Sequence, residues 1–175
     1  VLLIILLIAA APGAIYREHH YRSAVKALNS NDLVAAQEMF ADIPMYRDSE
    51  TLVQYEIPYL RAGKLMDAAA SEDRNALEEA GYTIYDVNED TTVSMLLYQA
   101  AENQYLALGD YKDSVELAET CRKNIVQEKE LLQKQAEEAR EQQNQASYEQ
   151  ASSLLFDGSY SEAAAAFEVL GDYKD

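Results

Sequence analysis

Few residues of this sequence combine the type and the spacing that chemistry requires. The two histidines, His19 and His20, are adjacent, and adjacent residues point to different faces of a helix, so a metal site would need further ligands. Cys121 is the single cysteine, which rules out an internal disulfide, and a reactive thiol needs an electropositive pocket. We therefore expect His19 and His20 to be polar residues without a metal, and Cys121 to be a small packed side chain.

Acidic residues cluster in the middle of the chain, at Glu78, Glu79, Glu89 and Asp90. Paired carboxylates carry out acid–base chemistry when a pocket holds them, and otherwise they form a solvated face. The loop DVNED, from Asp86 to Asp90, lacks the glycine and the distal glutamate of an EF-hand. The glycines stand singly, which leaves no phosphate-binding loop, and the histidines offer no base for a nucleophilic triad. The sequence predicts a protein that is not an enzyme and that uses no cofactor or metal.

The chain is strongly acidic. Its 31 Asp and Glu face 14 Lys and Arg, for a formal net charge of −17 over 175 residues. Nucleic-acid binders need clustered cations to displace counterions from the phosphates, and no run of Lys and Arg here is longer than two. Nearly half of the residues are hydrophobic, which is enough for a packed structure. We expect a folded chain without a nucleic-acid partner.

The first element that must be placed is a run of sixteen uncharged residues, 1–16 (VLLIILLIAAAPGAIY). Because about 20 apolar residues span a bilayer as a helix, this run predicts a transmembrane anchor. A signal-peptide remnant with Ala9 to Ala11 as its cleavage zone, and a buried core helix, are the alternatives. Arg17, Arg22 and Lys26 follow, but the positive-inside rule compares two flanks and only one is present, so the orientation stays open.

The five residues GDYKD occur at 109–113 and again at 171–175, and a looser copy, MYRDS, occupies 45–49. The segment 148–175 aligns without a gap on the segment 21–48, 127 residues earlier. The aligned pairs include Ala151 with Ala24, Leu155 with Leu28, Ala163 with Ala36, Phe167 with Phe40, and Tyr173 with Tyr46. Such self-similarity indicates a repeat architecture.

Within a unit, the apolar spacing is typical of two short helices joined by a turn. The first stripe consists of Ala151, Leu154 and Leu155 and ends at Gly158, and the second consists of Tyr160, Ala163, Phe167 and Leu170. A glycine after an apolar stripe is a common helix end, and spacings of three and four place residues on one helical face. The unit is therefore predicted to be a helical hairpin that cannot bury its apolar face alone.

The GDYKD motif then has a structural interpretation at the junction between units. Gly109 and Gly171 can adopt the positive φ that ends a helix. Tyr111 and Tyr173 are expected to fold back onto the apolar seam. Asp113 is predicted to cap the next helix, with Glu116 completing a capping-box-like pair, and Asp48 with Ser49 and Thr51 to do the same.

A second unit is less regular than the other two. Leu60, Gly63, Leu65 and Ala68 follow Leu28, Asn31, Leu33 and Ala36 at an offset of 32 residues, and the pattern resumes only at Ala101, Tyr105 and Leu108. We predict an insertion at about 71–93 within this repeat. After it, the segment from Ser114 to Asp157 has no Gly or Pro and is rich in strong helix formers. It predicts a long, largely solvated polar helix over 114–147 that spaces the third unit from the second, because the leucines of a coiled coil are missing. Pairing of its weak alanine stripe with a partner is the alternative.

The order of small residue, hydrophobic residue, glycine, tyrosine, alanine and aromatic residue from Ala151 to Phe167 resembles the tetratricopeptide repeat. The ending GDYKD is similar to the LGDYKDS ends of a bacterial variety of this family. The resemblance implies an all-α solenoid of helix–turn–helix units, anchored by a membrane helix that a cytoplasmic zinc ribbon sometimes precedes. This chain holds no ribbon cysteines. The expected domains are an anchor at 1–16, repeats at 17–50, 51–113 and 148–175, and the polar helix at 114–147.

These features predict a non-enzymatic, membrane-anchored scaffold that holds a protein or peptide partner in its repeat groove. The resemblance also implies a bacterial, single-pass protein with repeats outside the cytoplasm. Since the sequence begins at Val1 and ends within the motif, we expect a piece of a longer protein. The alternative is the stalk or sensor segment of a larger membrane protein with a catalytic or signalling domain elsewhere. A soluble adaptor is the third interpretation and requires residues 1–16 to be a buried helix.

Overall fold

The structure of the chain is a computed structural model that describes residues 2–171, 173 and 174, with side chains from Gly13 onward. All of its elements are helical, and no strand occurs among these residues apart from one isolated bridge between Asn88 and Thr91. The predicted all-α fold class is confirmed. The chain forms two compact units, Val1–Val126 and Gln127–Asp175, and each is described by itself.

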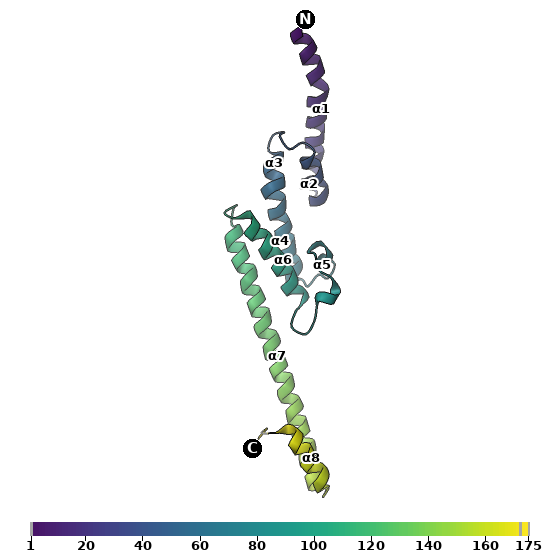
Figure 1. Ribbon diagram of the computed structural model, residues 1–175, viewed down its shortest axis with the longest axis vertical. Coiled ribbons are helices and arrows are strands. Elements are labelled where there is room, and N and C mark those ends of the chain that lie inside the picture. The colour runs from purple at the N-terminus through teal and green to yellow at the C-terminus, as the bar shows by residue number, and fades with distance from the viewer. Residues whose placement is uncertain (1, 172, 175) are drawn as a thin grey trace. The chain divides into compact units, whose positions relative to one another are not determined.

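The first unit begins with a hairpin of α1 (Leu2–Asn29) and α2 (Leu33–Ala41) (Figure 1). Asn31 makes the turn with a φ of 62°, a conformation that asparagine tolerates better than most residues. Asp32 caps α2 by accepting a hydrogen bond of 3.1 Å from the Ala35 backbone N–H. The buried core of this hairpin consists of Ala24, Leu33, Ala36 and Phe40, with Ile57 from the next hairpin.

The second hairpin of the first unit pairs α4 (Ile57–Ala70) with α6 (Val93–Leu108) (Figure 1). A short α3 (Ser49–Thr51) and a π-helical turn, η1 (Leu52–Glu56), lead directly into α4. Pro58 follows this turn, and because proline has no N–H, a wider helical turn just before it is a common adjustment. Ala62, Leu65 and Ala69 face α6, where Leu97, Ala101 and Tyr105 are buried in the same cluster.

Residues 71–92 connect α4 to α6 and contain α5 (Ala76–Glu79) and the 3-10 turn η2 (Ile84–Asp86). Leu77 is buried against the core. Thr83 and Asp86 form a capping box, and Thr92 caps α6 through the Met95 N–H at 3.2 Å. The connection is therefore held locally by its own turns, while Tyr85 is 93% exposed.

The remaining helices are α7 (Ser114–Phe156) and α8 (Tyr160–Leu170). The first turns of α7 bring Ala118 and Cys121 into the core of the second hairpin. In the second unit, Tyr148 on α7 packs edge-on against Phe167 on α8, with ring centres 5.5 Å apart. Ala151 and Ala163 are both buried there. The small side chains let the two helices approach closely.

Two boundaries differ from those that the sequence alignment suggests. Gly63, which aligns with the turn residue Asn31, lies inside α4, where a Cβ would meet the Tyr105 hydroxyl at 3.5 Å. The second hairpin therefore does not start 32 residues after the first: Tyr59 corresponds to Tyr21, 38 residues earlier. The helix predicted over 114–147 also extends further, since α7 runs from Ser114 to Phe156.

The predicted anchor at residues 1–16 lies mostly outside the residues whose side chains are described. Within the described part of the chain, no helix is both long and apolar enough to cross a membrane. The backbone of α1 runs through the end of the uncharged stretch without a break, from Leu2 to Asn29.

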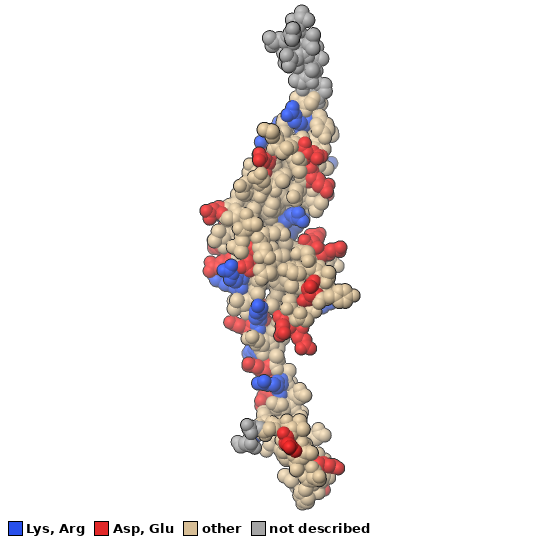
Figure 2. All heavy atoms as spheres, viewed as in Figure 1, with Lys and Arg blue, Asp and Glu red and all other residues tan. Residues whose placement is uncertain are grey.

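On the face shown in Figure 2, Lys and Arg side chains lie among Asp and Glu and form no continuous basic band.

Candidate functional site

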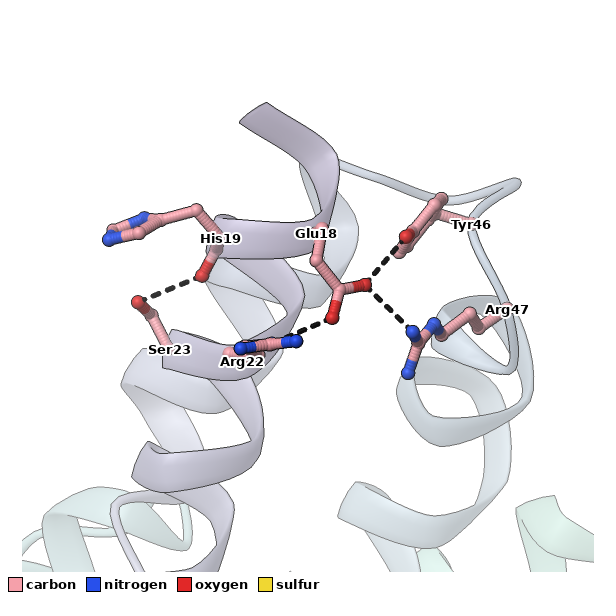
Figure 3. Close-up of polar contacts among 6 residues, drawn as sticks. All are labelled: Glu18, His19, Arg22, Ser23, Tyr46 and Arg47. Carbon is pink, nitrogen blue, oxygen red and sulfur yellow. Dashed lines mark hydrogen bonds and ion pairs between the residues drawn. The ribbon is translucent and has the colours of Figure 1, made fainter. Parts of the chain in front are cut away.

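A polar cluster closes the first hairpin where the loop after α2 returns to α1 (Figure 3). The Glu18 carboxylate on α1 accepts a hydrogen bond from the Tyr46 hydroxyl and forms an ion pair with Arg47. Both contacts are made by Oε2, each at 2.7 Å. Its other oxygen pairs with Arg22 Nε at 2.7 Å, one helical turn away. One acid thus holds two residues of the loop.

Tyr21 completes this cluster from the next turn of α1. Its hydroxyl donates to Asp48 Oδ1 at 2.6 Å, and its ring meets the Tyr46 ring edge-on at 5.8 Å. The Arg47 guanidinium lies 4.8 Å from the centre of the Tyr21 ring and 5.5 Å from that of Tyr46. Arg47 reaches this place with a φ of 52°. We call this arrangement a clasp. In a clasp, an acidic residue and a tyrosine three residues later on one helix (here Glu18 and Tyr21) bind three consecutive loop residues, a tyrosine, a cation and an aspartate (here residues 46–48).

The second hairpin has the same clasp. Glu56 accepts hydrogen bonds from the Tyr111 hydroxyl and Lys112 Nζ, both at 2.6 Å. The Tyr59 hydroxyl donates to Asp113 Oδ1 at 2.6 Å. Lys112, with a φ of 51°, lies 4.6 Å from the Tyr59 ring centre and 5.3 Å from that of Tyr111.

The second unit holds a third version. Lys174, with a φ of 61°, contacts Gln145 Oε1 and lies 5.4 Å from the ring centres of both Tyr148 and Tyr173. Gln145 takes the place of the glutamate of the other clasps, three residues before the helix tyrosine. The Tyr173 hydroxyl donates to Glu141 Oε1 at 2.5 Å and also lies 3.4 Å from Gln145 Oε1. Asp175 lies outside the described residues.

The clasps explain why the junction motif recurs, and they correct one of its predicted roles. The Asp48 side chain makes no capping hydrogen bond to α3, and its Oδ1 accepts from the Tyr21 hydroxyl. Asp113 likewise accepts from Tyr59. Sequence reasoning missed the helix residue that precedes the tyrosine of each clasp, which is Glu18, Glu56 or Gln145. The signal was present: Tyr21 and Tyr148 align at the offset of 127, with Glu18 and Gln145 at the same distance before them.

The serines after these aspartates have a different role. Ser49 and Ser114 are completely buried, and neither hydroxyl has a hydrogen-bond partner among the described residues. Each follows a clasp and begins the next helix. The position therefore needs a small side chain rather than a hydrogen bond.

The clasps also shift the pKa values of their members. The hydrogen bond to ionised Glu56 raises the pKa of Tyr111 to about 12, and the one to Glu141 raises the pKa of Tyr173 to about 12. The bonds from Lys112 and Tyr111 lower the pKa of Glu56, and those from Tyr46 and Arg22 lower the pKa of Glu18. In the second clasp, charged Glu56 and neutral Tyr111 therefore stabilise each other.

A pocket of about 420 Å³ lies in the first unit between the α1–α2 turn and helices α4, α5 and α6. Its lining consists of Ser30, Asn31, Asp32, Leu33, Val34, Arg61, Lys64, Leu65, Glu79 and Gln104. Both hairpins and the insertion thus contribute to one concave surface, and such surfaces are the usual binding sites of proteins.

The polar groups of this pocket are only partly engaged. Arg61 donates to the Gln37 side chain at 3.1 Å, and Lys64 donates to the Asn31 carbonyl at 2.7 Å. Neither cation pairs with a carboxylate of a described residue. Gln104 Oε1 is buried and has no partner in the part of the chain that the structure describes. The pocket thus offers two cations, Arg61 and Lys64, to a ligand.

The residues suspected of chemistry are placed as follows. Cys121 is completely buried, and burial raises the pKa of its thiol to about 11. His20 Nε2 lies 3.2 Å from Asp42 Oδ2, and the His20 ring stacks on Tyr16. Glu79 lines the pocket. Over the described residues, no three His, Cys, Asp or Glu side chains gather as metal ligands would.

The predicted repeat residues divide into buried and open positions. Most of them pack as small or aromatic core residues in the clusters given above. Tyr160 is an exception, since it is 70% exposed although the pattern placed it on the packed face of α8, and Leu155 is 49% exposed. Gly109, Gly158 and Gly171 end their helices with φ values of 59°, 86° and 60°. Ala68 packs against the core of the second hairpin.

Comparison with known proteins adds no relative. No family model matches the chain, no curated protein matches it, and no solved structure matches it.

Proposed function

We propose that this chain is a non-enzymatic scaffold of the tetratricopeptide-like type that holds a protein or peptide partner. The observation that carries the proposal is the pocket between the two hairpins of the first unit. It has two cations, Arg61 and Lys64, without carboxylate partners among the described residues. A peptide supplies the complementary groups, since its acidic side chains suit Arg61 and Lys64.

The clasps support a binding role because they fix the hairpins without using the pocket residues. A preorganised surface binds with a smaller entropic cost than one that must order on contact. The loops of the clasps contribute Tyr46, Arg47, Tyr111 and Lys112, none of which lines the pocket. Pocket and clasp are therefore separable by mutation.

Photocrosslinking in cells tests this proposal. Val34 lines the pocket and is 58% exposed, so p-benzoylphenylalanine fits there without disturbing the core. Tyr85, 93% exposed and not a lining residue, is the matched control. We expect a discrete protein adduct at position 34 that is absent at position 85 and is lost with Arg61→Ala and Lys64→Ala. No adduct, or equal adducts at both positions, would contradict the proposal and favour the stalk or sensor interpretation.

We further propose that residues 1–16 anchor the chain in a bacterial cell membrane as a single span, with the repeats outside the cytoplasm. The support is the uncharged sequence and the unbroken backbone of α1. The buried Cys121 thiol is a poor reporter, so a Tyr85→Cys probe in a Cys121→Ser background replaces it. Labelling of intact cells by a membrane-impermeant maleimide supports this topology. Labelling only after permeabilisation would place the repeats inside the cell.

A further inference from the structure

The loop between α2 and α3, residues 42–48, is held against α1 close to the end of the uncharged stretch (Figure 1). Its first residue, Asp42, contacts His20, its last, Asp48, accepts from Tyr21, and Tyr46 donates to Glu18 between them. The loop is thus tied at three points to residues 18–21 of α1. Figure 3 shows the last of these ties.

Met45 is the most exposed apolar residue of this loop, with 92% of its surface accessible. It lies between Pro44, which has no N–H to donate, and the tied Tyr46. Ile43 on the other side is buried, at 3% exposure. The loop therefore holds Met45 outward from a fixed base, where no described residue covers it.

The base of this loop lies close, along the axis of α1, to the end of the uncharged stretch. The uncharged run ends at Tyr16, and Glu18 follows two residues later, about 3 Å along the axis at 1.5 Å per residue. Ile15 lies three residues before Glu18 and so shares its face of α1. Ile15 and Tyr16 are 69% and 57% exposed, and tyrosine next to arginine is typical of a membrane interface.

We propose that Met45, together with Ile15 and Tyr16, forms a lipid-contacting surface that seats the first hairpin on the bilayer. This inference rests on the proposed anchor. Headgroups extend roughly 5–8 Å beyond each side of the hydrocarbon core, so a loop tied about 3 Å past the end of the span lies within them. Methionine suits this place because its flexible apolar side chain adapts to irregular surroundings.

Fluorescence of single-cysteine variants in vesicles tests the inference. An environment-sensitive nitrobenzoxadiazole probe is attached to Met45→Cys in the Cys121→Ser background, and the full chain is reconstituted into phosphatidylcholine–phosphatidylglycerol vesicles. Tyr85→Cys, which is equally exposed, is the matched control. We expect a blue shift of emission and quenching by lipids spin-labelled near the headgroup at position 45, and neither at position 85.

Flotation of the same samples separates the two proposals. If the chain floats with the vesicles but the probe at position 45 emits as in water, the lipid contact is refuted while the anchor stands. If the chain does not float, the anchor fails and the inference fails with it. Glu18→Ala, which cuts the central tie, is expected to reduce the blue shift at position 45 without affecting flotation.

Discussion

The hydrogen bond between Tyr111 and Glu56 gives a prediction whose size follows from the structure. Replacing Tyr111 with Phe removes one hydroxyl and keeps the ring, which stacks on Tyr55 at 5.3 Å and meets Tyr59 edge-on at 6.0 Å. Hydrogen bonds to charged groups contribute about 1.5–3 kcal/mol, and the partial exposure of this pair reduces the figure. We expect Tyr111→Phe to lower the free energy of unfolding by about 1 kcal/mol at neutral pH.

Urea unfolding followed by circular dichroism measures this loss as a lower midpoint with an unchanged slope. Tyr85→Phe is the control, because that hydroxyl is on a 93% exposed side chain. A double-mutant cycle with Glu56→Gln isolates the pair, since most of the loss should vanish when the acid is already neutral. If Tyr111→Phe costs no more than Tyr85→Phe, the clasp does not stabilise the hairpin.

The same bond has a defined pH window. The folded pKa of Tyr111, about 12, is above its unfolded value near 10. Its contribution is therefore complete below pH 10 and is lost as the pH rises through 12. The pKa of Glu56 is lowered from 4.5, so its contribution is complete above that value and is lost as the pH falls through the lower folded pKa. The difference between wild type and Tyr111→Phe should shrink at both ends.

Three further predictions concern packing. Ser114→Ala should leave the free energy of unfolding unchanged or raise it, because the buried hydroxyl has no partner among the described residues; a loss above about 1 kcal/mol would reveal a hydrogen bond there. Gly63→Ala should raise the free energy of unfolding by roughly 0.5–1 kcal/mol, since the added Cβ meets the Tyr105 hydroxyl at an ordinary 3.5 Å. Gly63→Leu should lower it by about 1–3 kcal/mol through overpacking. Thermal melts distinguish the two variants, and equal effects would contradict close packing of Gly63 against Tyr105. Cys121 should resist Ellman's reagent at pH 8 until urea unfolds the chain, because it is buried with a pKa of about 11; rapid reaction of the native protein would contradict its burial.

Local patterns in the sequence predicted the helices well because helix formation depends on spacing and on terminating residues. Gly109, Gly158 and Gly171 each stand just after an apolar stripe and each end a helix. Gly63 also follows such a stripe, yet α4 continues through it. The difference is tertiary: a small residue is needed beside Tyr105, and no local pattern distinguishes that need from a turn.

The clasps could not be predicted fully because they join residues far apart in the chain. Glu56 and Lys112 meet only after α4, the insertion and α6 have folded back. Asp48 stands before a helix, which made capping a reasonable prediction, but the side chain bonds Tyr21, 27 residues earlier, and not the helix end. The pocket likewise combines residues of two hairpins and the insertion, which only the assembled fold brings together.

Affinity for the crosslinked partner tests the central claim most directly. Calorimetry would compare its binding to the wild-type chain, to the Arg61→Ala and Lys64→Ala double variant, and to Tyr111→Phe as a clasp control outside the pocket. The account predicts a loss of at least about tenfold for the pocket variant, or roughly 1.4 kcal/mol, with little change for the control. Equal affinity of all three proteins would contradict the assignment of binding to this pocket.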